Sequence, residues 1–134
     1  MNYWLVKTEP ETYSWDDFTK KGRDIWEGVR NYQARNNLKA MKKGEKVLFY
    51  HSGKNPAVVG IAKVVREFYP DPSADSDKWV VVDLEPVRLL KKSVGLQEIK
   101  ADGRFNEIAL VKNSRLSVVP LKAQEYEWIV EKEK

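Results

Sequence analysis

The sequence predicts an α+β fold in which a small, strongly curved or barrel-like sheet carries short helices at its ends. Several apolar segments have the length and β-branched composition of strands, and two other segments begin at a capping residue and stop at a glycine. Because short helices separate the strands, their pairing must be non-local. No repeat, linker or low-complexity tract divides the 134 residues, so we expect one domain spanning 1–134.

The N-terminal segment predicts a strand followed by a short helix. Residues 2–7 mix β-branched and aromatic side chains, which is typical of a strand, and Pro10 brings it to an end. Ser14 is a helix-capping residue followed by acidic residues in the first turn, and Gly22 is a stop signal. We therefore expect a helix between Ser14 and Gly22.

A second helix is predicted from the cap at Asn31 to the stop at Gly44. Three apolar residues within it recur at helical spacing, namely Ala34, Leu38 and Met41. Three cations repeat the same four-then-three spacing on another face, namely Arg35, Lys39 and Lys42. The helix is thus expected to pack with one face and to present a basic stripe with the other.

Three further segments have the character of strands. Residues 45–51 alternate between two faces, whereas 57–65 is almost continuously apolar around Gly60, and 78–84 contains three successive valines. Pro86 marks an edge or a bulge, since proline cannot donate to a sheet ladder. These segments complete the expected sheet.

The C-terminal part carries weaker signals. Residues 87–116 have no clean period and are predicted largely as loop, with five apolar residues expected in the core: Leu96, Ile99, Ile108, Leu110 and Leu116. Pro120 precedes a predicted helix that begins at Leu121. A charged tail ends the chain.

Composition excludes several classes of function. The chain has no cysteine and one histidine, which excludes disulfides, thiolate zinc sites and cysteine nucleophiles. No phosphate-binding loop, dinucleotide fingerprint or serine-nucleophile elbow is present, so no cofactor and no metal are expected. Neither a secretory signal nor an apolar run of about 18 residues occurs. We therefore expect a cytoplasmic protein without a membrane partner, and its net charge of +4 favours polyanions only mildly.

The polar residues do not predict a catalytic centre. His51 and Ser52 are the only adjacent base and hydroxyl, and neighbouring strand residues point to opposite faces, so a triad is not expected. The acid pairs Asp16–Asp17 and Glu9/Glu11 are explained by helix capping and solvated loops. No residue is therefore assigned a catalytic role.

The segment from Ile25 to Arg35 is the most informative. Trp26 precedes a glycine-containing turn that leads into a helix start flanked by two arginines. An indole can stack on a base, free amides at a helix start can bind phosphate, and guanidinium pairs with phosphate. Nucleic acid suits all three features. An alternative is that Trp26 fills the core while Asn31 only caps the helix.

The chain resembles the EVE domain along nearly its whole length. The motifs occur in order at residues 3–10, 26–35 and 49–52, and then at 60–65, 69–71, 78–83 and 115–121. Thr8 stands where the family usually has serine; it keeps the hydroxyl and adds a methyl group.

This resemblance implies a PUA-like fold related to the YTH domain, which reads methylated adenine in RNA. The expected architecture is a curved sheet or open β-barrel of about five or six strands. EVE proteins are regarded as binders of modified bases, particularly modified cytosine in DNA, without a settled catalytic activity. The hypothesis is a non-catalytic module that reads a flipped-out modified base in an aromatic pocket.

The resemblance also implies which residues form the site. Trp26 and Trp79 are expected to sandwich the base, with edge recognition near Asn31. The expected base-pocket residues are Trp4, Thr8, Trp26, Val29, Asn31, Tyr50, His51, Ser52 and Trp79. The residues expected to contact the nucleic-acid backbone are Lys7, Arg30, Arg35, Lys39 and Arg115.

Three alternatives stay open at the level of sequence. The domain can bind modified RNA in place of DNA, or act as an enzyme on a nucleotide with His51 and Glu9 as its polar groups. It can also be an adaptor that binds another protein or a metabolite. DNA is the favoured partner because of the family resemblance.

Overall fold

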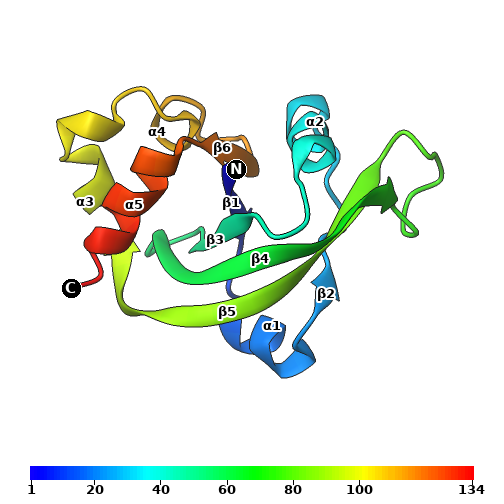
Figure 1. Ribbon diagram of the computed structural model, residues 1–134, viewed down its shortest axis with the longest axis horizontal. Coiled ribbons are helices and arrows are strands. Elements are labelled where there is room, and N and C mark those ends of the chain that lie inside the picture. The colour runs from blue at the N-terminus through cyan, green and yellow to red at the C-terminus, as the bar shows by residue number, and fades with distance from the viewer.

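The computed structural model describes residues 1–134 as a six-stranded mixed sheet with short helices around it (Figure 1). The strands are β1 (Tyr3–Thr8), β2 (Asp24–Ile25), β3 (Lys46–His51), β4 (Ala57–Pro70), β5 (Val80–Gly95) and β6 (Val118–Leu121). The helices are α1 (Trp15–Lys21), α2 (Tyr32–Ala40), α3 (Leu96–Lys100), the 3-10 helix η1 (Gly103–Phe105), α4 (Ala109–Lys112) and α5 (Ala123–Glu131).

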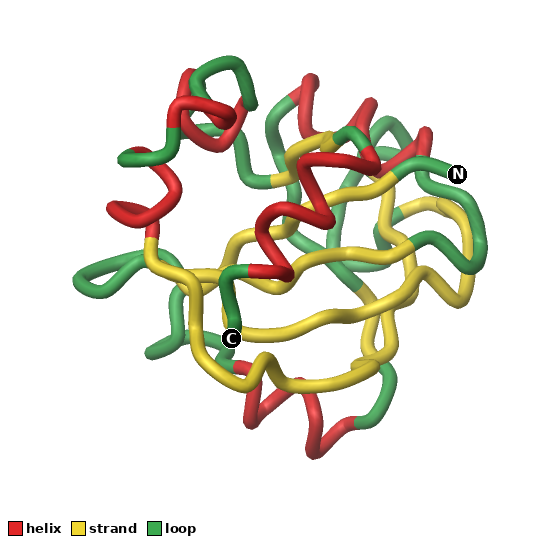
Figure 2. Tube along the Cα trace, turned by 60° about the vertical axis from the view of Figure 1, so that its left-hand side comes forward, coloured by secondary structure: helices red, strands yellow, loops and turns green.

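The sheet is open and strongly curved, which confirms the predicted fold class. Its strand order is β2-β5-β4-β3-β1-β6, so β2 and β6 form two free edges. Only β1 and β3 pair in parallel, and the other neighbours are antiparallel. Figure 2 shows the strands bending around the core with helices at the periphery. Helices α3, α4 and α5 gather on one side, apart from α1 and α2 (Figure 1).

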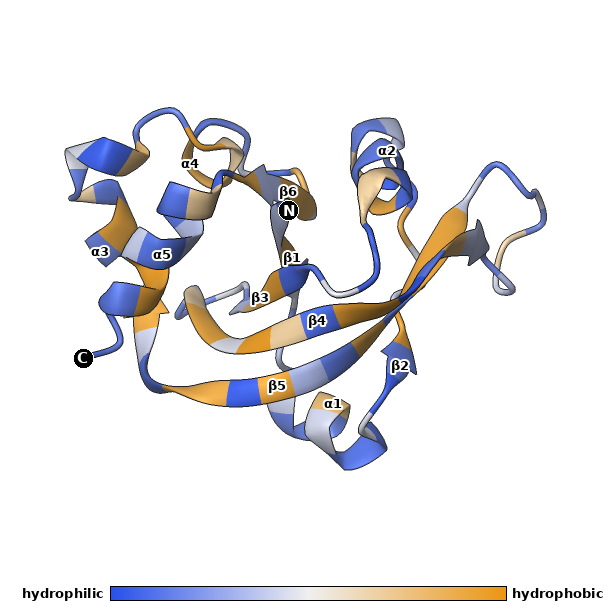
Figure 3. Cartoon of the chain, viewed as in Figure 1, coloured by the Kyte–Doolittle hydropathy of each residue, from blue (hydrophilic) through white to orange (hydrophobic).

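The core lies between the concave sheet and these helices. It joins 32 buried residues, and the central strands β1 and β3 contribute fully buried side chains such as Leu5, Val6 and Phe49. Figure 3 shows hydrophobic residues concentrated on the strands, and hydrophilic residues along the β4–β5 connection and over most of α2 and α5. No helix of the protein is both long and apolar enough to cross a membrane.

Local signals placed the first two helices correctly. Ser14 and Asp17 form a reciprocal capping box at the start of α1, and Gly22 ends the helix with a φ of 73°, which costs glycine little. The Asn31 side chain accepts a hydrogen bond from the amide of Ala34 and caps α2. However, α2 ends at Ala40 rather than at Gly44, because Met41 already has extended backbone.

The predicted loop from 87 to 116 is wrong in its first part. Strand β5 continues through this segment to Gly95 and pairs with β4 at Arg88, Leu89, Val94 and Gly95. Four register shifts between β4 and β5 interrupt the alternation of inward and outward side chains, so the sequence shows no period of two. The rest of the segment holds α3, η1 and α4, and all five expected core residues are packed there, four of them buried and Leu96 partly buried.

The two edge strands, β2 and β6, were not predicted from the sequence. β2 has only two residues, which is too short to detect as a pattern, and it pairs with Asp83 and Leu84 of β5. β6 contains Pro120, which an edge strand tolerates because one side of the strand has no partner. The predicted C-terminal helix therefore begins at Ala123 rather than at Leu121.

Candidate nucleic-acid interface

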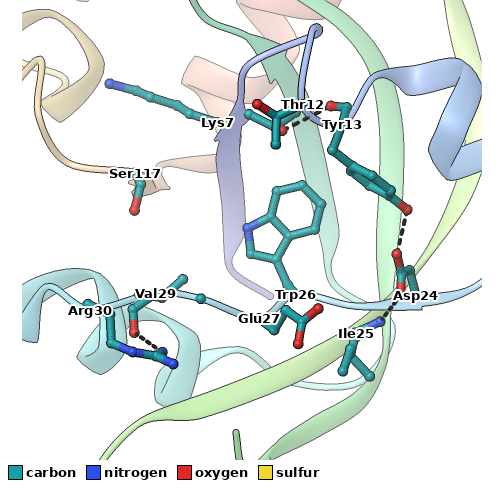
Figure 4. A pocket seen from close by; sticks show the side chains of 12 residues that line it. Lys7, Thr12, Tyr13, Asp24, Ile25, Trp26, Glu27, Val29, Arg30 and Ser117 are labelled. Atoms are coloured by element: carbon teal, nitrogen blue, oxygen red, sulfur yellow. Dashed lines mark hydrogen bonds between the residues drawn. The ribbon is translucent and has the colours of Figure 1, made fainter. Parts of the chain in front are cut away.

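A pocket of about 430 Å³ opens between the end of β1, the turn before α1, and the segment that joins β2 to α2 (Figure 4). This volume is in the range of about 300–1,000 Å³ that small-molecule sites occupy. Its lining consists of Lys7, Thr8, Thr12, Tyr13, Asp24, Ile25, Trp26, Glu27, Gly28, Val29, Arg30 and Ser117.

Trp26 belongs to both the core and the pocket. It is only 8% exposed, and its ring meets Tyr13, Phe18 and Phe49 edge-on, with centroid distances of 6.2, 6.5 and 5.7 Å. Its indole N–H has no acceptor within the protein, and since no fully buried side-chain nitrogen lacks a partner, this N–H reaches the pocket surface. The two interpretations of Trp26 offered by the sequence are therefore compatible.

Tyr13 and Asp24 form a hydrogen-bonded pair on one wall of the pocket. The Tyr13 hydroxyl donates to Asp24 Oδ2 at 2.6 Å, and the amide of Ile25 donates to Asp24 Oδ1 at 2.8 Å. Burial and the Asp24 carboxylate raise the pKa of Tyr13 well above its ordinary value. The Thr8 hydroxyl donates to the Tyr13 carbonyl oxygen at 2.9 Å. This wall is thus fixed by bonds among its own residues.

Asp71 anchors the segment that carries Trp26. Its buried carboxylate accepts from the amide of Gly28 at 3.0 Å, from Arg30 at 3.0 Å and from the amide and hydroxyl of Ser73. Burial opposes ionisation of Asp71, but these donors outweigh it and lower its pKa to about 2. Asp71 therefore ties the pocket wall to the β4–β5 connection.

A second aromatic cluster lies beside the pocket, on the far side of Arg30. The rings of Tyr32 and Trp79 stack with centroids 5.0 Å apart. Arg30 lies over Trp79 at 5.8 Å, Arg35 over Tyr32 at 5.0 Å, and Lys78 within 5.8 Å of both rings. We call Arg30, Tyr32, Arg35, Lys78 and Trp79 the basic platform. Tyr32 is 55% exposed, so this cluster is open to solvent.

Five of the sequence-predicted residues line the pocket. Thr8, Trp26 and Val29 come from the expected base-pocket set, and Lys7 and Arg30 from the expected backbone-contact set. Lys7 donates to the carbonyl of Ser114 at 2.9 Å, and burial lowers its pKa. This bond places the turn that carries Arg115 close to the pocket.

Six expected base-pocket residues lie outside the lining. Trp4 is buried and donates its indole N–H to Glu45 at 2.8 Å, Tyr50 is buried beneath Lys7, and Asn31 caps α2. Ser52 donates to the carbonyl of Thr8 at 3.3 Å. Trp79 belongs to the basic platform. The structure therefore does not bring Trp26 and Trp79 together as the two walls of one pocket.

His51, the sixth of these residues, has a structural contact. Its Nε2 accepts from the amide of Trp15 at 3.1 Å, at the start of α1, and its ring meets Phe49 edge-on. Burial lowers the pKa of His51, and the nearby acids Asp16 and Glu11 oppose this only in part. The neutral ring is thus an acceptor that supports α1.

The remaining residues that are expected to contact the nucleic-acid backbone lie on the surface of the protein. Arg35 is part of the basic platform and also donates to the carbonyl of Lys78 at 3.3 Å. Lys39 lies over the ring of the exposed Phe68, 5.4 Å from its centroid, and Arg115 is exposed. Arg30, Arg35 and Lys39 thus follow one side of the molecule from the pocket along α2.

Sequence reasoning missed Tyr13, Asp24, Asp71 and Tyr32. Tyr13 and Asp24 are separated by α1, and no periodicity links them. Asp71 lies far along the chain from its partners Gly28 and Arg30. The one available signal was Tyr32 itself, an aromatic residue in the first turn of a basic helix.

Comparison of the sequence with known proteins identifies the family of the chain. The model of the EVE domain matches residues 2–132. The chain belongs to the EVE domain family. Mouse thymocyte nuclear protein 1 is 37% identical over 163 residues, a match that covers 96% of this chain and 72% of the mouse protein.

Solved structures of EVE-domain and YTH-domain proteins share the fold. The human THYN1 protein in complex with 5-methylcytosine-containing DNA superposes with a TM-score of 0.93 and 34% identity, covering 100% of this chain and 98% of that one. The YTH domain of MRB1 from Zygosaccharomyces rouxii, solved with N6-methyladenosine RNA, gives a TM-score of 0.59 at 16% identity, over 99% of this chain and 86% of that one. The relation to the YTH domain is therefore one of fold.

Proposed function

We propose that this EVE-domain protein binds nucleic acid by receiving a flipped-out modified base in the pocket beside Trp26. The observation that carries the proposal is the pocket itself, in which a tryptophan N–H without a partner lies next to a basic, aromatic surface. The THYN1 complex adds that a relative of the same fold binds DNA containing 5-methylcytosine. We therefore propose modified cytosine in DNA as the first ligand to test.

The pocket offers the contacts that a flipped base needs. Leaving the stack costs a few kcal/mol, which aromatic and apolar walls offset. The apolar part of the lining comes from Tyr13, Ile25, Trp26 and Val29. A methyl group buried against Val29 or Ile25 contributes about 0.8 kcal/mol, so discrimination against the unmodified base is expected to be modest, below about tenfold.

The basic platform and its neighbours supply the affinity that does not depend on sequence. Arg30, Arg35 and Lys39 are positioned to contact phosphates, and the Tyr32–Trp79 stack offers an exposed face to a flanking base. This assigns Trp79 to the flanking nucleotides rather than to the base pocket. We propose no catalytic residue, because the ring of His51, the one histidine of the chain, is engaged with the amide of Trp15 and lies outside the pocket lining.

The test is a fluorescence-anisotropy titration with DNA and RNA oligonucleotides that carry cytosine, 5-methylcytosine, adenine or N6-methyladenine at one central position. We expect the DNA with 5-methylcytosine to bind more tightly than its unmodified parent. Trp26→Phe, which removes the free N–H and part of the wall, should weaken this binding. Trp128→Phe is the matched control, because Trp128 packs against Phe105 away from the pocket.

Two results would contradict the proposal. One is that no modified oligonucleotide binds better than its parent. The other is that Trp26→Phe binds as tightly as Trp128→Phe. Incubation with modified nucleotides followed by mass spectrometry tests the non-catalytic assignment, since any new product would show turnover.

A further inference from the structure

Three side chains of the pocket lining, those of Thr8, Tyr13 and Asp24, present hydrogen-bond acceptors and no free donor, and we call them the acceptor wall. Tyr13 has a single O–H, and it is donated to Asp24; Thr8 has a single O–H, and it is donated to the Tyr13 carbonyl. The lone pairs of both hydroxyl oxygens stay available. A carboxylate such as Asp24 accepts only. A ligand group that contacts these three side chains therefore meets oxygen lone pairs.

The direction of these hydrogen bonds is fixed. The raised pKa of Tyr13 keeps its phenol protonated over the physiological range, so its proton stays directed at Asp24. Asp24 also accepts from the amide of Ile25 and forms an ion pair with the ammonium of Lys21 at 3.4 Å, and its side chain is 17% exposed. These partners engage both carboxylate oxygens and hold the group in place beside the pocket.

The opposite side of the pocket presents hydrogen-bond donors. The indole N–H of Trp26 is a donor without an acceptor, and Figure 4 shows the indole nitrogen on the side of Ser117, away from Tyr13. Lys7 lines this side as a second donor. A ligand that satisfies both sides must carry an N–H group at one place and an acceptor at another.

We propose that the Tyr13–Asp24 pair selects bases with an exocyclic amino group on the pairing edge, cytosine and adenine derivatives, and rejects bases with a carbonyl oxygen there, such as thymine and uracil. This inference rests on the proposed function, because it concerns the same pocket. An amino group donates to the Tyr13 or Asp24 oxygens. A carbonyl oxygen in its place would face their lone pairs, lose its hydrogen bond with water and gain none.

Thymine and 5-methylcytosine form the matched pair for the test, since they share ring size and methyl group and differ only along the pairing edge. Each is placed in the same DNA duplex opposite an abasic site, so that neither base has a pairing partner to lose. We expect 5-methylcytosine to bind about tenfold or more tightly than thymine, because sites built on hydrogen bonds discriminate more strongly than apolar niches.

Two variants address the pair directly. Asp24→Asn introduces an amide donor in place of an acceptor and should bring the ratio of the two affinities close to one. Tyr13→Phe removes one acceptor and should lower the ratio part of the way. The control is Glu11→Gln, which removes a negative charge from an exposed residue beside Thr12, outside the lining. It should leave the ratio unchanged, and thermal melting verifies that each variant is folded.

The outcomes separate this inference from the function on which it rests. If 5-methylcytosine and thymine bind equally, or if Asp24→Asn keeps the wild-type ratio, the acceptor wall does not select the base. An equal change in Asp24→Asn and Glu11→Gln would show an effect of net charge and would also overturn the inference. If 5-methylcytosine binds no better than cytosine while thymine is still rejected, the modified-base proposal fails and the selection by the acceptor wall holds.

Discussion

The two aromatic regions on either side of Arg30 differ in enclosure. Trp26 is only 8% exposed, and the rings of Tyr13, Phe18 and Phe49 pack edge-on against it. Around Tyr32, which is 55% exposed, rings and cations stack on each other in solvent. An enclosed wall can discriminate between ligands because an unmatched polar group there has no water to compensate it. An open surface adds affinity without discrimination.

The largest expected effect on stability comes from removing the enclosed ring. Trp26→Ala should lower the free energy of unfolding by about 3–5 kcal/mol, since it leaves a cavity among Tyr13, Phe18 and Phe49. Trp79→Ala, which removes a half-buried ring from the otherwise open basic platform, should cost less than about 1.5 kcal/mol. Urea denaturation measures both. Equal losses would remove the distinction between the two regions.

Asp71 connects the two regions, and its loss should have the next largest effect. Asp71→Ala leaves the Gly28 amide and Arg30 without their acceptor and should cost about 1–3 kcal/mol at pH 7. The folded-state pKa of about 2 lies below the unfolded value of about 3.9, so the stabilisation is complete above pH 4 and is lost as the pH falls through 2.

The measurement for Asp71 is urea denaturation of wild type and Asp71→Ala at several pH values. The difference between the two proteins should be constant from pH 7 to pH 5 and shrink between pH 4 and pH 2. A difference that does not change with pH would show that the contribution of Asp71 is independent of its charge.

On the core side of Trp26, the backbone of β4 at Gly60 lies in close contact with the ring of Trp15. A Cβ at Gly60 would lie 2.5 Å from the ring of Trp15, which packs on Phe49 next to Trp26. Gly60→Ala should therefore destabilise the fold by about 1–3 kcal/mol. Gly103→Ala is the control, because a Cβ there meets no atom within 4 Å and the change should fall within about 0.5 kcal/mol. Thermal or urea denaturation of the two variants measures both changes in stability.

The smallest effect is expected for a substitution in the basic platform, where it should change only the affinity for DNA. Arg35→Gln should weaken binding of every DNA sequence by a similar factor and reduce the slope of log K against log salt by about 0.7–0.9. It should not change the preference for a modified base. Anisotropy titrations at several salt concentrations measure the slope, and a change in base preference would show that the platform takes part in reading the base.

Sequence reasoning succeeded where the physical cause is local. The caps at Ser14 and Asn31 bond to amides three residues away, so their effect is visible in a short window of sequence. It failed for the second half of β5, where the strand is maintained by pairing with β4 and register shifts hide its period. The site divides in the same way. The segment from Trp26 to Arg30 was recognisable, whereas Asp71 gains its role from Gly28 and Arg30, which lie far away along the chain, and Asp24 bonds to Tyr13 across α1.

The sequence by itself determined the fold class, the family and the segment that carries the pocket tryptophan, because capping, apolar patterning and ordered motifs are all properties of neighbouring residues. Only the tertiary structure decided that Trp26 and Trp79 lie in different regions, that His51 supports α1, and that Tyr13 and Asp24 form an acceptor wall. These facts depend on how β1, β2 and the β4–β5 connection meet in space. Hydrogen bonds between distant segments leave no trace in local pattern.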